Sequence, residues 1–305
     1  GFALVSVAGP TIVQRTRIEG NKGAESGGGC YVVGTSSSNL TMINCLVVNN
    51  ISGCNLESKA SGCGAWVRGP AVRFINCTIA DNRPDDDVTC NGGGLYLCGV
   101  NEDTPYKAIN CIIWGNQADT GEEIDLGRGI LEIDYCDTDQ SKISSSGEVL
   151  WGDNNITSVP RLMKHTNTDK PEVAYCLRPY LNGQASPCID AGDNTPDGMS
   201  EEEFKCYLDL FGGRSRIEDG NNDSTAVVDI GAFEMLPGEE LSAWPLPADA
   251  TWDCAVNLLD LLLIRNNLNR EVNTHVRIRC DVNSDGKINI LDLIFTRNNF
   301  NRTCQ

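Results

Sequence analysis

The chain has 305 residues, a formal net charge of −18 and a sequence pI near 4.4. An acidic chain of this kind is repelled by phosphate backbones and by anionic lipids, which argues against nucleic acid and membrane surfaces as partners. No apolar run is long enough to span a bilayer, and the length suits one long core plus one small module.

Fifteen cysteines stand against only two histidines, His165 and His275, and no C-x-x-C pair occurs. This usage favours disulfides over zinc sites and predicts a secreted or cell-surface protein. The cysteine count is odd, so at least one thiol is free, bonded to another chain or paired outside this sequence. With no signal peptide at its start, the chain reads as a processed secreted form or an excised fragment.

A repeat fills residues 1 to about 136. An Ile-Asn-Cys segment recurs with its cysteine at Cys45, Cys77 and Cys111, at spacings of 32 and 34 residues. Each unit holds short alternating β segments broken by glycine and asparagine, with no amphipathic helical window. Such units bury their apolar face only by stacking. We therefore predict a parallel β-helix, a solenoid whose coils lie about 4.8 Å apart.

Stacking would align equivalent residues into rows. The isoleucines of the repeated segment are expected to form an internal ladder: Ile43, Ile75 and Ile109. Asparagines are expected to stack at a turn, where their amides hydrogen-bond to one another and tolerate left-handed backbone: Asn50, Asn82 and Asn116. An aromatic row is expected to serve core or wall packing, with sugar stacking as the alternative: Tyr31, Trp66 and Tyr96.

Cys45, Cys77 and Cys111 occupy one row, and they form either a buried thiol stack or disulfides. Nearer in sequence, Cys54 with Cys63 and Cys90 with Cys98 flank loops, and we expect those two pairs to be bridged. Six asparagines begin an Asn-x-Ser/Thr sequon, which permits glycosylation: Asn39, Asn50, Asn76, Asn155, Asn222 and Asn301.

From about residue 137 to 236 the repeat is expected to decay into a C-terminal cap. Residues 186–194, with the sequence SPCIDAGDN, and residues 228–234, with the sequence VDIGAFE, resemble the closing segment of a family of secreted bacterial right-handed β-helix proteins. The resemblance spans roughly residues 1–236 and implies a mainly β, right-handed parallel β-helix. It is a poor guide to activity, because the fold hosts lyases, hydrolases and adhesins.

A third calcium site or a solvated Asx-rich turn is expected at Asp219, Asn221, Asp223 and Asp229.

After a linker at 237–246, residues 247–305 contain a second repeat, in which the stretch from Leu259 returns 32 residues later from Leu291. Each copy is a predicted helix that follows a calcium-loop pattern. The expected ligands of the second loop are Asp281, Asn283, Asp285, the Lys287 carbonyl, Asn289 and Asp292. Those of the first loop are Asp249, Thr251, Asp253, Asn257 and Asp260, with Cys254 in place of the turn glycine, which predicts a looser site.

Two such loops, each followed by one helix, resemble a dockerin over its whole length. The resemblance implies a small α-helical, calcium-binding module that docks through its helix surfaces, usually onto a cohesin domain. Loop positions 10 and 11 are apolar here, whereas many dockerins carry small hydroxyl residues there. The candidate docking residues are Arg265, Asn266, Arg297 and Asn298. The alternative is a calcium-stapled tail that only caps or solubilises the chain.

Two functional hypotheses follow. The first is an extracellular, non-catalytic scaffold, adhesin or filament subunit, because the chain enters β structure at Phe2 with nothing to cover the first coil. Its partners would be a cohesin or a neighbouring protomer in a head-to-tail assembly. The alternative is a polysaccharide lyase or glycoside hydrolase, which needs convergent carboxylates and a base. The candidate carboxylates are Asp85, Asp86, Asp87, Glu122, Glu123, Asp125 and Asp134, and the candidate bases are Arg68, Arg73 and Arg128.

Overall fold

The structure is a computed structural model of the chain, and it divides into two compact units. The first unit is Gly1–Pro160 with Pro187–Pro237, and the second is Arg161–Ser186 with Gly238–Gln305. The residues that the structure describes are 2–7, 9–34, 39–53, 60–69, 71–99, 104–163, 175–177, 185–210, 215–221, 223–236, 250, 256–270, 280, 282 and 287–301. The 237–246 linker therefore lies outside them.

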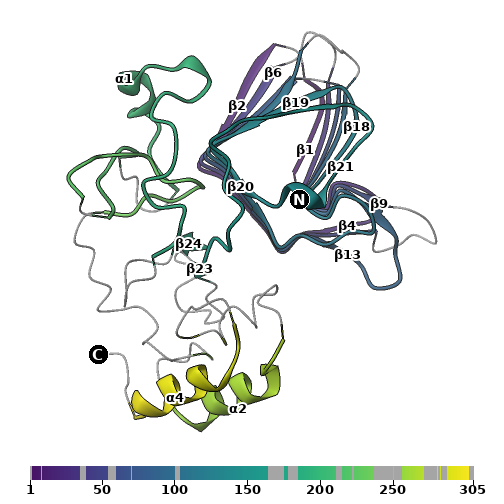
Figure 1. The fold of residues 1–305 in the computed structure, drawn as a ribbon. Helices are drawn as coiled ribbons and strands as arrows, with labels where there is room; N and C mark the ends of the chain where they lie inside the picture. Colours follow the sequence, from purple (N-terminus) through teal and green to yellow (C-terminus); the bar gives the residue numbers. More distant parts are fainter. Residues whose placement is uncertain are drawn as a thin grey trace. The chain divides into compact units, whose positions relative to one another are not determined.

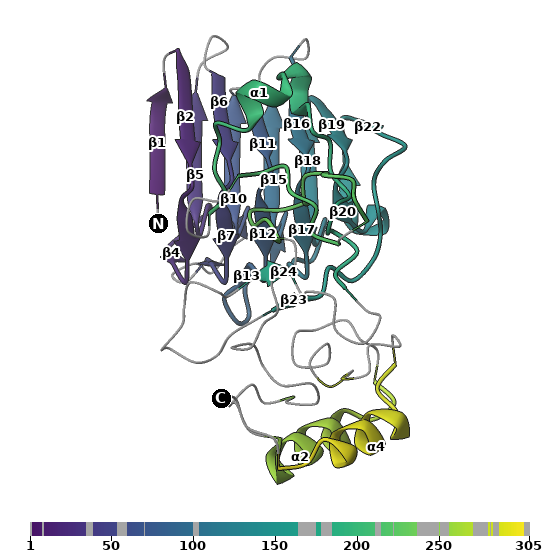
Figure 2. The same ribbon diagram turned by 90° about the vertical axis from the view of Figure 1, so that its left-hand side faces the viewer.

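The first unit is built around a parallel β-helix, as predicted. Figure 1 views its coils end-on, and Figure 2 shows the equivalent strands of successive coils side by side. One six-stranded sheet contains β1 (Phe2–Val7), β5 (Cys30–Gly34), β10 (Ala65–Gly69), β15 (Leu95–Gly99), β18 (Ile124–Arg128) and β21 (Ile143–Ser145). A second contains β2 (Pro10–Gln14), β6 (Asn39–Ile43), β11 (Ala71–Ile75), β16 (Tyr106–Ile109), β19 (Ile130–Asp134) and β22 (Glu148–Trp151).

Shorter strands complete each coil. A third sheet contains β3 (Arg17–Glu19), β7 (Leu46–Val48), β12 (Thr78–Ala80), β17 (Ile112–Trp114) and β20 (Asp137–Thr138). Two small parallel sheets contain β4 (Lys22–Gly23), β8 (Ile51–Ser52) and β13 (Arg83–Pro84), and β9 (Ala60–Ser61) and β14 (Cys90–Asn91). We expected a cap from residue 137, but β20, β21 and β22 instead continue all three large sheets, with a 3-10 turn at Gln140–Lys142.

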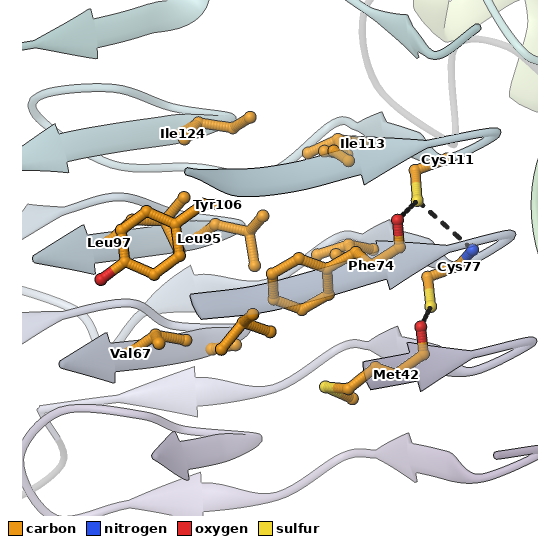
Figure 3. Packing of buried hydrophobic residues seen from close by; sticks show 14 of the residues in the cluster. Met42, Val67, Phe74, Cys77, Leu95, Leu97, Tyr106, Cys111, Ile113 and Ile124 are labelled. Carbon is orange, nitrogen blue, oxygen red and sulfur yellow. Dashed lines mark hydrogen bonds between the residues drawn. The ribbon is translucent and has the colours of Figure 1, made fainter. Parts of the chain in front are cut away.

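The interior of the β-helix is filled by alternate residues of the strands. Met42 and Phe74 point inward into one apolar cluster, together with Leu95 and Leu97 of the facing sheet (Figure 3). The predicted internal ladder of isoleucines is wrong. Because side chains alternate along a strand, Ile43 and Ile75 point away from that cluster, although both are fully buried.

Residues 187–236, which we call the lateral segment, cover those outward isoleucines. Its described parts include a 3-10 turn at Pro196–Gly198 and α1 (Glu201–Phe204), whose Phe204 packs with Ile43 and Ile75. Figure 2 shows this segment crossing the strands of several coils. It therefore lies along the side of the β-helix, in contrast to the cap that the sequence suggested.

Three asparagines, one in each of three successive coils, anchor the lateral segment. Asn44 donates its side-chain amide to the Leu208 carbonyl at 2.8 Å, and Asn76 donates to the Asp229 carbonyl at 2.8 Å. Asn110 donates to the Asp193 carbonyl at 2.9 Å. All three asparagines have positive φ, between 47° and 54°, so this left-handed turn aims their side chains at the segment. The two closing motifs also meet, since Ile230 N–H donates to the Cys188 carbonyl.

The predicted asparagine row forms a hydrogen-bonded ladder at the next turn of each coil, after the strand of the third sheet. The Asn50 side-chain amide donates to Asn82 Oδ1 at 2.9 Å, and that of Asn82 donates to Asn116 Oδ1 at 2.9 Å. The left-handed backbone that we expected at these asparagines falls one residue earlier, at Asn49 (φ 55°) and Asp81 (φ 59°). The ladder ends on Glu123, which accepts from the Asn116 amide at 2.7 Å.

The buried end of this ladder makes folding sensitive to pH. Burial raises the pKa of Glu123 from 4.5 to about 8, so the folded state holds a proton that the unfolded state releases above pH 4.5. Stability from this group is complete at low pH and is lost as pH rises through about 8. We expect Glu123→Gln to flatten the fall in the urea midpoint over that range.

In Glu123→Gln the urea midpoint should still fall somewhat with rising pH, because burial also raises the pKa values of Asp137 and Asp229 to about 7. The matched control is Glu122→Gln, which removes the neighbouring, half-exposed carboxylate that pairs with Lys142 at 3.0 Å. An equal flattening in both variants would show that Glu123 is not the group responsible.

The cysteine row is a thiol stack, which decides between the two alternatives left open by the sequence. Cys45, Cys77, Cys111 and the next row member, Cys136, are buried in the interior cluster as free thiols. Each thiol donates to carbonyls, as Cys77 does to that of Met42 at 3.4 Å and Cys111 to that of Phe74 at 3.3 Å (Figure 3). Burial raises the pKa of Cys77 and of Cys111 well above the usual value, which makes them inert.

The expected Cys90–Cys98 bridge is absent, since both residues are free thiols. Cys90 is fully buried beside Ala60, whereas Cys98 is partly exposed and follows Tyr96 on the outer wall. Cys54, the expected partner of Cys63, lies outside the described residues.

The described part of the second unit contains a two-stranded antiparallel pair and two helices. The strands are β23 (Leu162–Met163) and β24 (Cys176–Leu177), and the helices are α2 (Leu258–Asn267) and α4 (Ile290–Asn298). The helices contact each other and lie side by side (Figures 1 and 2). They occupy the positions predicted from the 32-residue repeat.

Candidate docking site

Both helices begin in the same way, at the end of a predicted calcium loop. Asn257 accepts the N–H of Leu259 at 2.8 Å, and its own N–H donates to Asp260 Oδ2 at 2.7 Å. Asn289 and Asp292 repeat the arrangement at 2.7 and 2.8 Å. These reciprocal contacts are capping boxes, which fix the start of each helix and hold the aspartate against the loop.

The asparagines and aspartates of these boxes are positions 9 and 12 of the predicted loops, so the structure brings together two of the predicted ligands of each loop. Asp260 and Asp292 are fully buried, and all of the predicted donors are oxygens, which fits a hard cation such as calcium. Lys287, whose carbonyl is the predicted position 7, has an exposed side chain. The remaining predicted ligands lie outside the described residues: Asp249, Thr251, Asp253, Asp281, Asn283 and Asp285.

One face of each helix packs inward against a small core. Ile264 of α2 is fully buried in a cluster with Cys280 and Ile288, and Leu293 and Phe295 of α4 pack against it. Thr296, which is equivalent to the larger Ile264, is also fully buried. The other faces of both helices are therefore left to form the surface.

That surface is apolar. Leu258 is 60% exposed and its equivalent Ile290 is 61% exposed. Leu262 and its equivalent Ile294 are 38% and 45% exposed. These residues are not part of the core beneath them, and their exposure at equivalent positions of both repeats makes the surface a candidate site of interaction.

A groove with a volume of about 490 Å³ runs between the two helices. Its lining consists of four positions taken from both repeats, namely Leu258, Leu261, Leu262 and Arg265 of α2 and Ile290, Leu293, Ile294 and Arg297 of α4. Six of the eight residues are aliphatic, and an exposed arginine of each repeat completes the lining. Among the residues that the structure describes, neither guanidinium forms an ion pair.

The four predicted docking residues are thus all exposed, and the structure places Arg265 and Arg297 in the groove lining. Asn266 and Asn298 are exposed but are not part of that lining. Sequence reasoning missed the aliphatic members of the groove. The 32-residue offset could have found them, because Leu258, Leu261 and Leu262 each return as an aliphatic residue.

Two helices, each at the end of a predicted calcium loop, thus present a duplicated apolar groove, an arrangement suited to protein docking. Residues 247–301 match the Dockerin type I domain family, in agreement with the sequence resemblance. Dockerin type I domains bind calcium and dock onto cohesin partners, and they occur in secreted cellulosome proteins. The comparisons found no matching curated protein and no matching solved structure. No helix in the described part of the chain is long and apolar enough to cross a membrane.

The third predicted calcium site is a hydrogen-bonded turn with a buried neighbour. The Asp223 N–H donates to Asp219 Oδ1 at 3.0 Å and to Asn221 Oδ1 at 2.8 Å. Asp229 is buried, and its carboxylate accepts the N–H groups of Asp190 and Met235 at 2.8 and 2.6 Å. Within the described ranges no group of three or more acidic, cysteine or histidine residues suits a metal, so this site stays a prediction.

The aromatic row lies on the outer wall of the β-helix. The rings of Tyr31 and Trp66 stack with centroids 4.6 Å apart and planes 4° apart, and Tyr96 continues the stack 6.3 Å from Trp66. Stacked rings cover each other's faces, and a sugar would need those faces. The geometry therefore supports wall packing over a sugar platform.

The candidate catalytic residues are spread over different parts of the solenoid. Glu123 is engaged by the asparagine ladder, and Arg73 forms an ion pair with Asp197 of the lateral segment. Asp134 accepts from Asn154 near the far end of the β-helix. The others lie in the turn after β13 (Asp85, Asp86 and Asp87), beside Lys142 (Glu122) or along the first sheet (Asp125, Arg68 and Arg128). His165 and His275 lie outside the described residues.

Two of the six sequons are incompatible with a glycan on the folded chain. Asn50 and Asn76 are fully buried, and their amides donate to Asn82 and to the Asp229 carbonyl. Asn39 and Asn155 are partly buried and hydrogen-bonded. Asn301 is exposed, and Asn222 lies outside the described residues.

Proposed function

We propose that this chain is an extracellular, non-catalytic scaffold whose C-terminal module attaches it to a cohesin-type protein partner in the presence of calcium. The observation that carries the proposal is the duplicated groove between α2 and α4, with its aliphatic lining and paired arginines. The parallel β-helix would then present a long, rigid wall that the module tethers to its partner.

The groove also indicates the chemistry of the partner surface. Leu258, Ile290, Leu262 and Ile294 offer apolar area that water would leave on docking, at about 25 cal/mol per Å² buried. Arg265 and Arg297 are suited to carboxylates at the rim of that area. We therefore expect a partner face with an apolar centre flanked by acidic side chains.

The test is to place a carboxylate in the groove. Leu262→Asp with Ile294→Asp is expected to weaken binding of recombinant type I cohesin domains at least 100-fold, because both new charges must be desolvated on docking. Isothermal titration calorimetry in calcium-containing buffer measures the affinity. Light scattering of the chain alone, with calcium and then with excess chelator, shows whether a second copy is the occupant instead.

Asn269→Asp with Asn301→Asp is the matched control, because it adds the same two charges to exposed, equivalent positions that are neither in the groove lining nor among the predicted docking residues. It should bind within a few-fold of the unmodified chain. Equal affinity of both variants would overturn the groove as the docking site. Release of unsaturated or reducing sugars from acidic polysaccharides by the chain would overturn the non-catalytic role.

A further inference from the structure

Cys63 and Cys90, from successive coils of the β-helix, bring their sulfur atoms together. In the structure both are fully buried free thiols, and their Sγ atoms are 2.9 Å apart, in hydrogen-bond contact. Non-bonded carbon atoms pack at roughly 3.5–4.0 Å, and the sulfurs of a disulfide lie about 2.05 Å apart, so this sulfur–sulfur distance lies between the two. We propose that Cys63 and Cys90 form a disulfide that joins one coil to the next.

The local backbone explains why these two residues meet although they are 27 positions apart in sequence. β9 and β14 pair in parallel with Cys90 opposite Ala60. Gly62 then adopts a φ of +64°, and the following Cys63 N–H donates to the Gly92 carbonyl at 3.1 Å. This turn returns the chain toward the β9–β14 pair, where Cys63 and Cys90 pack in one small cluster with Ala60.

The row that contains Cys63 isolates its thiol from the other coils. The equivalent residues of the coils on either side are Gly28 and Gly93, which have no side chain. The Cys63 thiol therefore has no neighbour directly above or below it in its own row. Besides Cys90, its polar contact is Ser52, whose hydroxyl donates to Cys63 Sγ at 3.0 Å.

The other described thiols of this region are held apart from the pair. Cys45, Cys77 and Cys111 donate to backbone carbonyls in the thiol stack, and Cys98 is on the outer wall. The Cys90 thiol also has a carbonyl acceptor, that of Asn91 at 3.6 Å, so what sets the pair apart is the close approach of its two sulfurs. Cys54 lies outside the described residues, and a bond from Cys63 to Cys54 is the competing outcome in the test below.

Bond formation is written as thiol–disulfide exchange with a small-molecule disulfide, such as oxidised glutathione, as the oxidant. Cys90, as its thiolate, attacks the oxidant. That attack forms a mixed disulfide and expels one thiol. Cys63 then attacks Cys90 Sγ and expels the second thiol, so one disulfide is reduced to two thiols while one is formed. Because both cysteines are buried after folding, this exchange belongs to the folding stage.

The direct test is a disulfide map of the full chain, produced in an oxidising secretory compartment and alkylated without reduction. Trypsin releases Cys63 in peptide 60–68, which holds no other cysteine. We expect this peptide to be linked to peptide 74–107, at a mass two hydrogens below the sum of the two, with fragmentation assigning the bond to Cys90 rather than Cys77 or Cys98. Alkylation of both Cys63 and Cys90, or a bond from Cys63 to Cys54, would overturn the proposal.

A second measurement, the Tm with and without reductant, tests the proposal on the unmodified chain even if a variant folds poorly. Reduction of the unmodified chain is expected to lower its Tm by on the order of 10 °C, because the reduced unfolded chain regains the freedom of a long closed loop. Cys63→Ser, Cys90→Ser and the double variant should all lack this response to reductant and resemble one another. Cys77→Ala, which removes a thiol of the stack, should keep the response. A response to reductant that survives in Cys63→Ser would show that another pair is responsible.

Discussion

Replacing Asn82 with alanine is expected to lower the free energy of unfolding of the β-helix by about 4 kcal/mol. Asn82 accepts the backbone N–H and the side-chain amide of Asn50 and donates to the Val47 carbonyl and to Asn116. All of these groups are buried, so alanine leaves several of them without a partner and without water. Calorimetry should show Tm lower by roughly 10 °C.

Asn21→Ala is the control for this prediction. Asn21 stands at the half-buried start of the same ladder, where its side-chain amide donates to Asn50 Oδ1 at 2.9 Å. After the change, its backbone N–H still donates to Asn50 Oδ1 at 3.0 Å, so that oxygen keeps a partner. Loss of the Asn21 side chain should cost about 1 kcal/mol. If the two variants lose the same stability, burial of the ladder is not the source of its strength.

Removing the carboxylate at position 12 of a calcium loop is expected to have the second large effect. In Asp292→Asn the amide oxygen can still accept the Asn289 N–H, so the helix cap is kept while one anionic ligand is lost. We expect calcium affinity at that loop to fall at least 100-fold, as measured by calorimetric titration. Far-UV circular dichroism should show helix formation moving to a correspondingly higher calcium concentration.

The equivalent change in the first loop, Asp260→Asn, gives a built-in comparison. That loop has Thr251 at position 3 and Cys254 in place of glycine, so its site is expected to be the weaker of the two. Asp260→Asn should therefore leave the tighter of two binding phases in place, and Asp292→Asn should remove it. Two unchanged phases in Asp292→Asn would mean that the second loop does not bind calcium through Asp292.

The architecture followed from features that are local in the sequence. The recurrence of Cys45, Cys77 and Cys111 set the length of a coil, and Asn82 and Asn116 marked its turn. In the module, the return of Leu259 as Leu291 gave both helices and the capping aspartates. Such features are visible because stacked repeats place equivalent residues in the same environment.

What the sequence could not show depends on contacts between distant residues. Ile43 is buried on the outside of its strand because Phe204, far along the chain, covers it. Without that cover, two adjacent apolar residues such as Met42 and Ile43 leave the inward face undecided. The sequence predicts a bridge from Cys63 to the nearby Cys54, whereas stacking of the coils places Cys63 beside Cys90. Loop spacing alone carries no information on such a pairing.

The lateral segment has a consequence for how the β-helix unfolds. A plain solenoid has only nearest-neighbour contacts, so its coils can open one at a time from either end. Here Asn44, Asn76 and Asn110 all donate hydrogen bonds to the lateral segment. Opening any of their coils therefore weakens the contacts of that segment with the other two. Arg15 of the first coil donates to the Asp209 carbonyl, and Asp137 of the fifth coil accepts from the Cys188 thiol of the same segment. The coils from Arg15 to Asp137 should therefore unfold as one cooperative block.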